Sequence, residues 1–256
     1  MIDCIILAAG YATRLYPLTK DTPKPLLPVA GKPIIDHLVE KADAVPDLGE
    51  VVVVTNRRFI SHFNAWRAAH PRGDGISVLD DGTTSNETRI GALADLALAA
   101  KYRHRIGTDS RPAIVLAGDN LFDFSLADFA SFCRECDTDC ITTHHQPERV
   151  RLQRTGVVEV DNNWRVTGFQ EKPQEPRSTW AVPPFYRYTG ETMAERLPRF
   201  LAGGHEADAP GSWIPWLIER VPVHAFRFSG ARYDIGNLES YAEVRRAFGE
   251  DRKSVV

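Results

Sequence analysis

The apolar positions in the first half of the chain follow two patterns that alternate. The short stretches at 5–9, 50–55 and 76–79 are rich in apolar residues and lack the regular polar alternation of a half-exposed strand, so they predict strands buried on both faces. Over 34–44 and 59–70 the apolar residues instead recur at three- and four-residue steps, which predicts amphipathic helices. Strands and helices that alternate at this spacing form right-handed crossovers. We therefore expect an α/β fold with a Rossmann-like, mostly parallel central sheet.

The pattern changes in the second half of the chain. Apolar and polar residues alternate over 155–160 and 164–170, on either side of a short polar turn, which predicts a β-hairpin. Another strand is expected over 178–188, although Pro183 and Pro184 remove two amide donors from it. The other predicted elements are strands over 113–120, 140–143 and 221–228 and helices over 86–98, 126–136, 191–201 and 237–248, with a frayed tail at 249–256.

A long loop rich in glycine and proline follows the first strand, between residues 10 and 33. Small residues beside Gly10 leave room for a ligand against the backbone, and the amides that follow are free to face an anion. Arg14 and Lys24 add positive charge to the loop. Long loops without secondary structure are uncommon unless they are functional. The pattern therefore predicts a phosphate-binding loop, one without a Walker A motif, and the alternative is a simple connector with solvated cations.

Composition limits the class of protein. The 256 residues are 43% apolar and 25% charged, which suits one α/β domain with a substantial core. A net charge of −3 gives no general attraction to nucleic acid or to a membrane surface, so we expect neither as a partner. No apolar run approaches the roughly 20 residues of a membrane span, and the N-terminus lacks the basic region of a signal peptide. We therefore expect a cytoplasmic protein.

Three of the four cysteines lie close together in the sequence. Cys133, Cys136 and Cys140 are followed by His144 and His145, a set that could bind zinc. However, Cys133 and Cys136 continue the spacing of an apolar helix face, and Cys140 begins a strand where a small buried residue fits. We therefore favour core packing over a zinc site.

A carboxylate ends the strand predicted to begin at residue 113. At the C-terminal end of a central parallel strand, Asp119 points into the same crevice as the loop after the first strand. A carboxylate beside phosphate oxygens would repel them unless a divalent cation lay between, so we interpret Asp119 as a Mg²⁺ ligand. The alternative is a cap for the turn that follows it.

The loop after the first strand also carries a motif of a known family. Residues 10–19 (GYATRLYPLT), 23–25 (PKP) and 28–33 (PVAGKP) resemble the signature of sugar-1-phosphate nucleotidylyltransferases, of which the glucose-1-phosphate thymidylyltransferases are best known. The resemblance spans about residues 2–246. Further similar segments are 118–120 (GDN), 171–173 (EKP) and 233–236 (YDIG).

The resemblance implies a particular architecture. Members of the family have the nucleotide-diphospho-sugar transferase fold, a three-layer α/β/α sandwich with a small β-rich part that binds the sugar. We expect a single nucleotidyltransferase domain over 1–256. Within it, 1–140 would form the nucleotide-binding half, 141–235 the sugar-phosphate-binding half, and 236–256 a closing helix and tail.

The resemblance also implies roles for individual residues. Arg14 would hold the leaving pyrophosphate, Lys24 would contact phosphates near the α-phosphorus, and Lys172 would hold the phosphate of the sugar. Asp119 and Asp234 would hold Mg²⁺. Nucleotide-binding residues are expected at Leu7, Ala9, Gly10, Tyr11, Thr13, Thr84, Ser85, Asn86 and Gly91. Sugar-binding residues are expected at Asn120, Gly156, Glu171 and Lys172.

Two stretches depart from the family pattern. The thymidylyltransferases have a glutamine and a proline-containing turn in the loop where this chain has 84–86 (TSN), so these polar residues are candidate base readers, with helix capping as the alternative. Pro184 stands where many members have glycine, so we expect altered sugar contacts. Trp213 and Trp216 could wall the acceptor site or pack in the core.

The implied reaction joins a nucleoside triphosphate and a sugar 1-phosphate into a nucleoside diphosphate-sugar and pyrophosphate, with Mg²⁺ as cofactor. The resemblance favours dTTP or UTP with a hexose 1-phosphate. Two alternatives stay open. One is CTP- or GTP-dependent transfer to phosphocholine or another phosphorylated alcohol or sugar, and the other is a non-catalytic nucleotide-sensing module. The oligomeric state is open as well, a homo-oligomer included.

Overall fold

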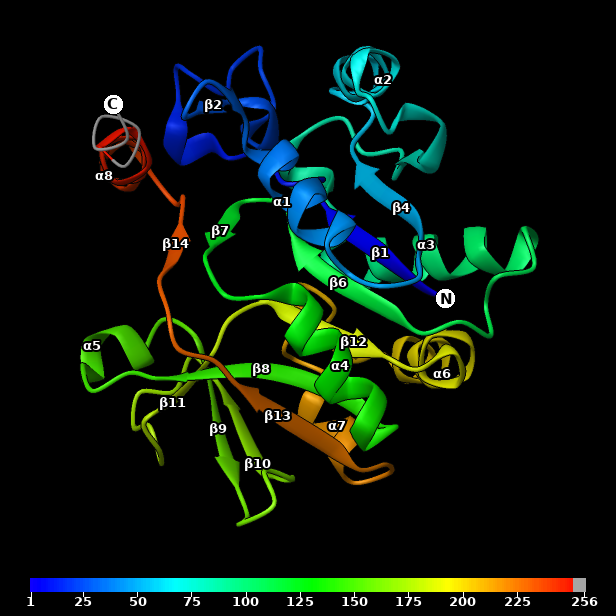
Figure 1. The fold of residues 1–256 in the computed structure, drawn as a ribbon, viewed down its shortest axis with the longest axis vertical. Coiled ribbons are helices and arrows are strands. Elements are labelled where there is room, and N and C mark those ends of the chain that lie inside the picture. The colour runs from blue at the N-terminus through cyan, green and yellow to red at the C-terminus, as the bar shows by residue number, and fades with distance from the viewer. Residues whose placement is uncertain (251–256) are drawn as a thin grey trace.

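A ten-stranded mixed sheet forms the centre of the computed structural model, which describes residues 1–250 (Figure 1). Its strands follow the order β10-β9-β11-β8-β12-β6-β1-β4-β5, and β13 pairs with β8. They are β1 (Ile2–Leu7), β4 (Leu48–Thr55), β5 (Ile76–Asp80), β6 (Ala113–Ala117), β8 (Asp139–His145), β9 (Gly156–Val160), β10 (Val166–Glu171), β11 (Trp180–Val182), β12 (Phe185–Tyr188) and β13 (Val223–Arg227). Two short ladders join β2 (Pro28–Val29) to β3 (Lys32–Pro33) and β7 (Asn120–Phe122) to β14 (Arg232–Asp234).

Helices connect most of these strands. They are α1 (Ile34–Asp43), α2 (Ile60–Ala69), α3 (Ala92–Arg105), α4 (Leu126–Cys136), α5 (Arg149–Leu152), α6 (Leu197–Ala202), α7 (Ile214–Ile218) and α8 (Leu238–Glu250). A π-helical turn (Thr192–Arg196) leads directly into α6. Within residues 1–250, no helix has both the length and the apolar character needed to cross a membrane.

Four strands at one end of the sheet, β6-β1-β4-β5, are parallel throughout. In β1, Cys4 and Ile6 belong to one buried core cluster, whereas Ile5 between them belongs to another. Val52 and Val53 of β4 divide between the two clusters in the same way. Because successive side chains of a strand point to opposite faces, this end of the sheet is covered on both faces. The apolar stretches predicted these strands, and the expected α/β fold is confirmed.

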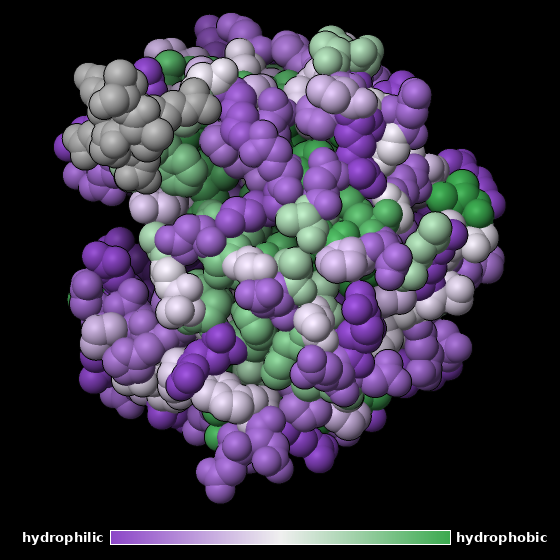
Figure 2. Space-filling view, in the orientation of Figure 1, coloured by the Kyte–Doolittle hydropathy of each residue, from purple (hydrophilic) through white to green (hydrophobic). Residues whose placement is uncertain are grey.

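The helices cover the two faces of the sheet (Figure 1). On one face, Leu38 of α1 and Phe129 of α4 join the core cluster that contains Ile6. On the other face, Leu96 of α3 joins the cluster that contains Ile5, with α6 beside it. The molecule is therefore the expected three-layer α/β/α sandwich. Figure 2 shows that the face toward the viewer is mainly hydrophilic, with hydrophobic residues gathered in a band across its middle.

The other end of the sheet is β-rich and mainly antiparallel. There β9 and β10 form the predicted hairpin. The single strand expected over 178–188 is broken into β11 and β12, because Pro183 and Pro184 supply no amide donors. As a result β11 pairs with β8 and β9, whereas β12 pairs with β6 and β8.

Three local predictions were wrong in detail. The helix expected over 86–98 begins only at Ala92 and continues to Arg105, because a short 3-10 turn (Asn86–Thr88) comes first. The loop between residues 10 and 33 is more regular than expected, with two 3-10 turns and the β2–β3 ladder. The tail expected at 249–256 is helical at its start, since α8 continues to Glu250, and 251–256 lie outside the described residues.

The cysteine cluster packs in the core. Cys133 of α4 and Cys140 of β8 are fully buried, whereas Cys136 is partly exposed. Burial, followed by the neighbouring Cys140 thiol, raises the pKa of Cys133 far above its ordinary value. A thiol that stays protonated is a poor metal ligand and a poor nucleophile. The geometry thus agrees with core packing.

Candidate active site

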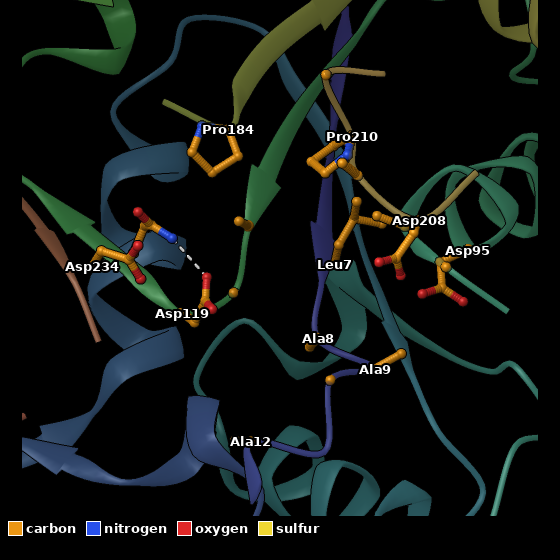
Figure 3. A pocket seen from close by; sticks show the side chains of 18 of the residues that line it. Leu7, Ala8, Ala9, Ala12, Asp95, Asp119, Pro184, Asp208, Pro210 and Asp234 are labelled. Carbon is orange, nitrogen blue, oxygen red and sulfur yellow. Dashed lines mark hydrogen bonds between the residues drawn. The ribbon is translucent and has the colours of Figure 1, made fainter. Parts of the chain in front are cut away.

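A cavity of about 490 Å³ opens at the carboxyl ends of β1 and β6. The loops that follow these strands line it, together with residues around β9 and β10 and a segment at 208–211. Figure 3 shows Leu7 near the middle of this cavity, with Asp119 and Asp234 on one side and Asp95 and Asp208 on the other. This is the place where open α/β sheets bind ligands.

Hydrogen bonds fix the backbone after β1. The Ala8 amide donates to the Val54 carbonyl at 2.8 Å, and Asn56 Nδ2 donates to the Ala9 carbonyl at 2.9 Å. A Cβ at Gly10 would meet nothing within 4 Å, so open space borders the backbone there. The start of the loop is thus a rigid surface of small residues facing the cavity.

Two cations of the loop line the cavity in different states. Arg14 is exposed, and within residues 1–250 its side chain makes no hydrogen bond or ion pair. Lys24 is buried, and its Nζ donates to Asp119 Oδ2 at 2.7 Å. Arg14 is therefore available to an anionic ligand, whereas Lys24 already neutralises a carboxylate.

Polar contacts link Asp119 to Asp234. Asn120 Nδ2 donates to Asp119 Oδ1 at 2.6 Å, and Arg232 Nε donates to Asn120 Oδ1 at 2.7 Å. Arg232 Nη2 also lies 3.3 Å from Asp234 Oδ2. The β7–β14 ladder brings these residues together, because Asn120 and Asp234 are cross-strand partners. Each carboxylate is thus paired with one cation.

The pKa of Asp119 reflects this network. Burial by itself would raise that pKa, but the charge and the hydrogen bond of Lys24 act in the opposite direction. The Asn120 amide and the Arg232 guanidinium add to the effect, and together they hold the pKa below the ordinary value. Asp119 is therefore ionised at neutral pH, as a metal-binding carboxylate must be.

The two carboxylates fit a Mg²⁺ ion. Mg²⁺ is usually bound through one or two carboxylates and takes its other ligands from water and from substrate phosphates. Asp119 and Asp234 lie on the same side of the cavity (Figure 3), and both are hard oxygen donors. Within residues 1–250, no group of three or more His, Cys, Asp or Glu side chains is arranged to hold a metal. A cation at this pair would therefore depend on ligands from a substrate.

Gly156, Glu171 and Lys172 line another wall of the cavity. A Cβ at Gly156 would lie 2.6 Å from the Phe169 ring, so no larger residue fits there. Burial raises the pKa of Glu171, and the Lys172 charge, 3.8 Å away, opposes this rise. Lys172 has a left-handed φ of 44°, held by a hydrogen bond from its amide to the Thr155 carbonyl at 3.1 Å. Such strained residues cluster at functional sites.

A segment from the second half of the chain crosses the cavity to the start of α3. We call residues 206–212 the strap. The Leu93 amide, in the first turn of α3, donates to the Ala207 carbonyl at 3.0 Å. Gly91 has a φ of 91°, and a Cβ there would lie 2.7 Å from the Ala207 oxygen. Glycine is therefore required at this position by both its conformation and its close contact with the strap.

The far end of the strap reaches the wall that carries Glu171. A Cβ at Gly211 would lie 2.5 Å from Glu171 Oε2. Pro210 and Pro184 both line the cavity (Figure 3). Because proline has no amide donor, neither residue can donate a backbone hydrogen bond to a ligand.

Most of the residues predicted from the sequence line this one cavity. They are Leu7, Ala9, Gly10, Tyr11, Thr13, Arg14, Lys24, Asn86, Gly91, Asp119, Asn120, Gly156, Glu171, Lys172 and Asp234. Thr84 and Ser85 are not among the residues that line it, and their role as base readers stays a prediction. The Ser85 amide donates to Thr88 Oγ1 at 3.2 Å, which caps the 3-10 turn. This contact agrees with the capping alternative.

Several lining residues were not predicted. Arg232 adjoins the Asp234 motif, so its position could have suggested it. Asp95 and the strap residue Asp208 had no such signal, because they reach the cavity only through tertiary packing. Trp213 is fully buried and donates its Nε1 to the Tyr188 hydroxyl at 2.9 Å, so it packs in the core and does not wall the site.

Comparison with known proteins adds to this picture. The sequence matches the family model described as "Nucleotidyl transferase" over residues 3–250. It is 30% identical to the glucose-1-phosphate adenylyltransferase of Thermomicrobium roseum, over 98% of this chain and 60% of that protein. It is also 30% identical to the UTP–glucose-1-phosphate uridylyltransferase of Haloferax volcanii, over 98% of both chains. The chain spans between 51% and 60% of the length of several of the curated relatives it matches.

The fold is shared with solved structures. A structure of UDP-glucose pyrophosphorylase complexed with UDP-glucose matches with a TM-score of 0.79 at 23% identity, covering 98% of this chain and 100% of that one. This likeness shows the nucleotide-diphospho-sugar transferase fold expected from the sequence.

Proposed function

Because the chain belongs to the nucleotidyl transferase family, we propose that it transfers a nucleoside monophosphate from a nucleoside triphosphate to a sugar 1-phosphate. The observation that carries this proposal is the convergence of Arg14, Lys24 and Lys172 with two carboxylates on one cavity. A phosphate-bearing donor and a phosphate-bearing acceptor both need cationic partners. The cavity supplies them from elements that are far apart in the sequence.

The proposed reaction is a displacement at the α-phosphorus. An oxygen of the sugar phosphate forms the new bond to the α-phosphorus, and the bond from that phosphorus to the bridging oxygen breaks, which releases pyrophosphate with the electron pair. The attacking phosphate has a second pKa of about 6 and is mostly ionised at neutral pH, so it needs no general base. Within residues 1–250, no serine, cysteine or histidine lines the cavity.

The remaining difficulty is the negative charge of the substrates and of the departing pyrophosphate, which cationic residues of the chain would neutralise. The two substrates repel each other, and negative charge grows on the departing pyrophosphate, so positioning and cationic stabilisation dominate such a transfer. In the proposed roles, Arg14 holds the pyrophosphate, Lys24 contacts phosphates near the α-phosphorus, and Lys172 holds the acceptor phosphate. Asp119 and Asp234 would hold Mg²⁺, which supplies further neutralisation of phosphate charge when bound.

The acceptor side favours a sugar. Glu171 lies partly buried beside Gly156 and can accept hydrogen bonds from hydroxyl groups, for which a choline headgroup has no equivalent. The two relatives named above act on glucose 1-phosphate by name, and we propose a hexose 1-phosphate here. The dTTP or UTP and the cytoplasmic location expected from the sequence stay predictions.

Pyrophosphate release tests the proposal. The purified chain is incubated with Mg²⁺, each of ATP, CTP, GTP, UTP and dTTP, and either glucose 1-phosphate, another hexose 1-phosphate or phosphocholine. We expect release with at least one triphosphate and a hexose 1-phosphate, accompanied by the nucleoside diphosphate-sugar. If pyrophosphate is released only with phosphocholine, the acceptor is a phosphorylated alcohol and not a sugar 1-phosphate. Binding of a triphosphate with no release for any acceptor would favour the nucleotide-sensing module.

The pair Asp119 and Asp234 allows a prediction about the Mg²⁺ requirement of the reaction. Asp119→Asn removes a charged oxygen donor and leaves Lys24 without its anionic partner. We expect the Mg²⁺ concentration for half-maximal rate to rise about tenfold or more, measured by titration of Mg²⁺ at saturating substrates. Asp74→Asn, on the exposed turn before β5, is the control and should leave the titration unchanged. An unaltered titration for Asp119→Asn would remove this residue from the metal site.

The contact between the strap and Glu171 allows a prediction about binding of the sugar 1-phosphate. In Gly211→Ala the new Cβ would overlap Glu171 Oε2, so the carboxylate must move away from the sugar. We expect KM for the sugar 1-phosphate to rise about fivefold, the cost of one hydrogen bond, with little change in KM for the triphosphate. Gly249→Ala is a matched control, because a Cβ there meets nothing within 4 Å. Equal changes in both KM values would argue against a specific contact with the acceptor.

A further inference from the structure

Asp95 is a buried carboxyl group on the side of the cavity away from Asp119 and Asp234 (Figure 3). It lies in the first turn of α3, is 6% exposed, and lines the cavity. Its Oδ1 is buried and accepts no hydrogen bond from a donor group within residues 1–250, and the hydrogen-bonding neighbour of the carboxyl group is the Asp81 carboxyl. An unpartnered buried polar atom is costly and uncommon in folded proteins. A ligand in the cavity could supply the missing hydrogen bond.

The groups around Asp95 do not neutralise it. Asp81, just after β5, also lines the cavity, and it accepts hydrogen bonds from the Thr83 amide at 2.7 Å and from Thr83 Oγ1 at 3.0 Å. Asp208 of the strap lies beside Asp95 (Figure 3) but is paired with Arg89 at 3.1 Å. The charged neighbour of Asp95 is therefore the Asp81 carboxyl, and the Arg89 charge is already engaged by Asp208.

These surroundings change the acidity of Asp95. Burial is the main cause, the charge of Asp81 is the next and a hydrogen bond with the Asp81 carboxyl is the third, and together they raise the pKa of Asp95 to about 7. Burial also raises the pKa of Asp81, while its hydrogen bonds from Thr83 oppose the rise. Near neutral pH, Asp95 can thus be present as a hydrogen-bond acceptor or as a donor.

The location suggests what it would meet. In Figure 3, Asp95 and Asp208 lie across Leu7 from Asp119 and Asp234. If the phosphates of a triphosphate lie at the carboxylate pair and its cations, the base extends toward the end of the cavity that holds Asp95. This step rests on the proposed function, because it assumes a nucleoside triphosphate as the ligand.

Nucleobases differ in the group that they would present to a carboxyl. Adenine and cytosine carry an exocyclic amino group, which donates, whereas uracil, thymine and hypoxanthine carry a carbonyl at the same position, which accepts. We propose that Asp95 is the residue that distinguishes amino-bearing from carbonyl-bearing nucleobases in this cavity. The ionised carboxylate accepts a hydrogen bond from the amino group and repels the carbonyl oxygen. This preference departs from the dTTP or UTP favoured by the family resemblance.

Matched pairs of nucleotides test the inference. The dissociation constants of CTP and UTP, and of ATP and ITP, are measured calorimetrically at pH 6 and pH 8.5 for the wild type and for Asp95→Asn. For the wild type we expect the amino-bearing member of a pair to gain roughly tenfold or more over its partner as the pH rises. In Asp95→Asn the side chain offers both a donor and an acceptor without charge, so the discrimination should be weak and independent of pH.

The controls separate this inference from the proposed function. Asp74→Asn should keep the discrimination of the wild type, since this residue lies on the exposed turn before β5. Unchanged discrimination in Asp95→Asn, together with normal pyrophosphate release, would overturn the inference and leave the function intact. Discrimination that is lost in Asp95→Asn, in a chain that releases no pyrophosphate, would support the inference and overturn the function. If neither member of either pair binds, both fail.

Discussion

Arg14→Ala lowers the rate of pyrophosphate release by roughly a hundredfold, the expected cost of removing one cationic donor from a developing negative charge. The guanidinium is exposed, lines the cavity, and within the described residues makes no hydrogen bond or ion pair. Its removal should therefore leave the fold and its stability unchanged. The measurement is kcat with saturating triphosphate and sugar 1-phosphate, together with the thermal midpoint of the variant.

A neighbour in the same loop controls for nonspecific effects. Lys20 is also exposed, and its side chain neither lines the cavity nor forms an ion pair within residues 1–250. Lys20→Ala removes the same unit of positive charge and should retain nearly full activity. If Arg14→Ala turned over at the wild-type rate, or if Lys20→Ala lost as much, Arg14 would have no specific part in the chemistry.

The effect should appear in kcat as well as in KM. An interaction made equally in the ground state and in the transition state changes KM alone. Arg14 differs from Lys24 in this respect, because Lys24 is already engaged with Asp119 at 2.7 Å. Arg14 is available for charge that appears only as pyrophosphate departs.

Local sequence patterns predicted the part of the fold that depends on burial along single strands. The run at 5–9 indicated a strand buried on both faces, and Cys4, Ile5 and Ile6 of β1 are indeed buried in alternating core clusters. The same reasoning placed Asp119 at a strand end beside the loop that holds Lys24, and the two side chains are in contact. Such inferences succeed because the carboxyl ends of parallel strands meet at one edge of the sheet.

Contacts between distant segments could not be predicted in this way. Asp208 of the strap meets Arg89 and the turn at Gly91, yet nothing in either segment specifies the other. The polar run at 84–86 fits base reading and helix capping equally well, and capping of a 3-10 turn accounts for Ser85. The strap and Asp95 could be recognised as parts of the cavity only from the tertiary structure, because tertiary packing places them there.

Asp95→Asn raises the free energy of unfolding of the ligand-free protein at alkaline pH. The folded-state pKa of Asp95 is raised to about 7 from an ordinary value of 3.8, mainly by burial. The folded state therefore binds the Asp95 proton more tightly than the unfolded state does. The Asp95 carboxyl stabilises the folded state fully only below its pKa in the unfolded chain. This stabilisation is lost as the pH rises through the folded-state pKa of about 7.

In Asp95→Asn the side chain at this position does not ionise, so its contribution to stability does not change with pH. Relative to the wild type, its stability should increase by about 3 kcal/mol between pH 4.5 and pH 8.5, at 1.36 kcal/mol for each pKa unit. This figure already includes the repulsion from Asp81, which is one of the causes that raise the pKa of Asp95. The measurement is urea unfolding of both proteins at several pH values, without nucleotide. Asp74→Asn, exposed on its turn, should show no pH-dependent difference.

A stability gain of this size would mean that the native carboxyl is retained against its cost to folding. Groups that destabilise a fold yet face a cavity are expected where they serve a ligand. If the difference between Asp95→Asn and the wild type stayed constant from pH 4.5 to pH 8.5, Asp95 would titrate as an ordinary carboxyl, and a pH-dependent choice between amino-bearing and carbonyl-bearing bases would lose its physical basis. If the difference grows with pH while nucleotide discrimination falls, the same buried charge accounts for both.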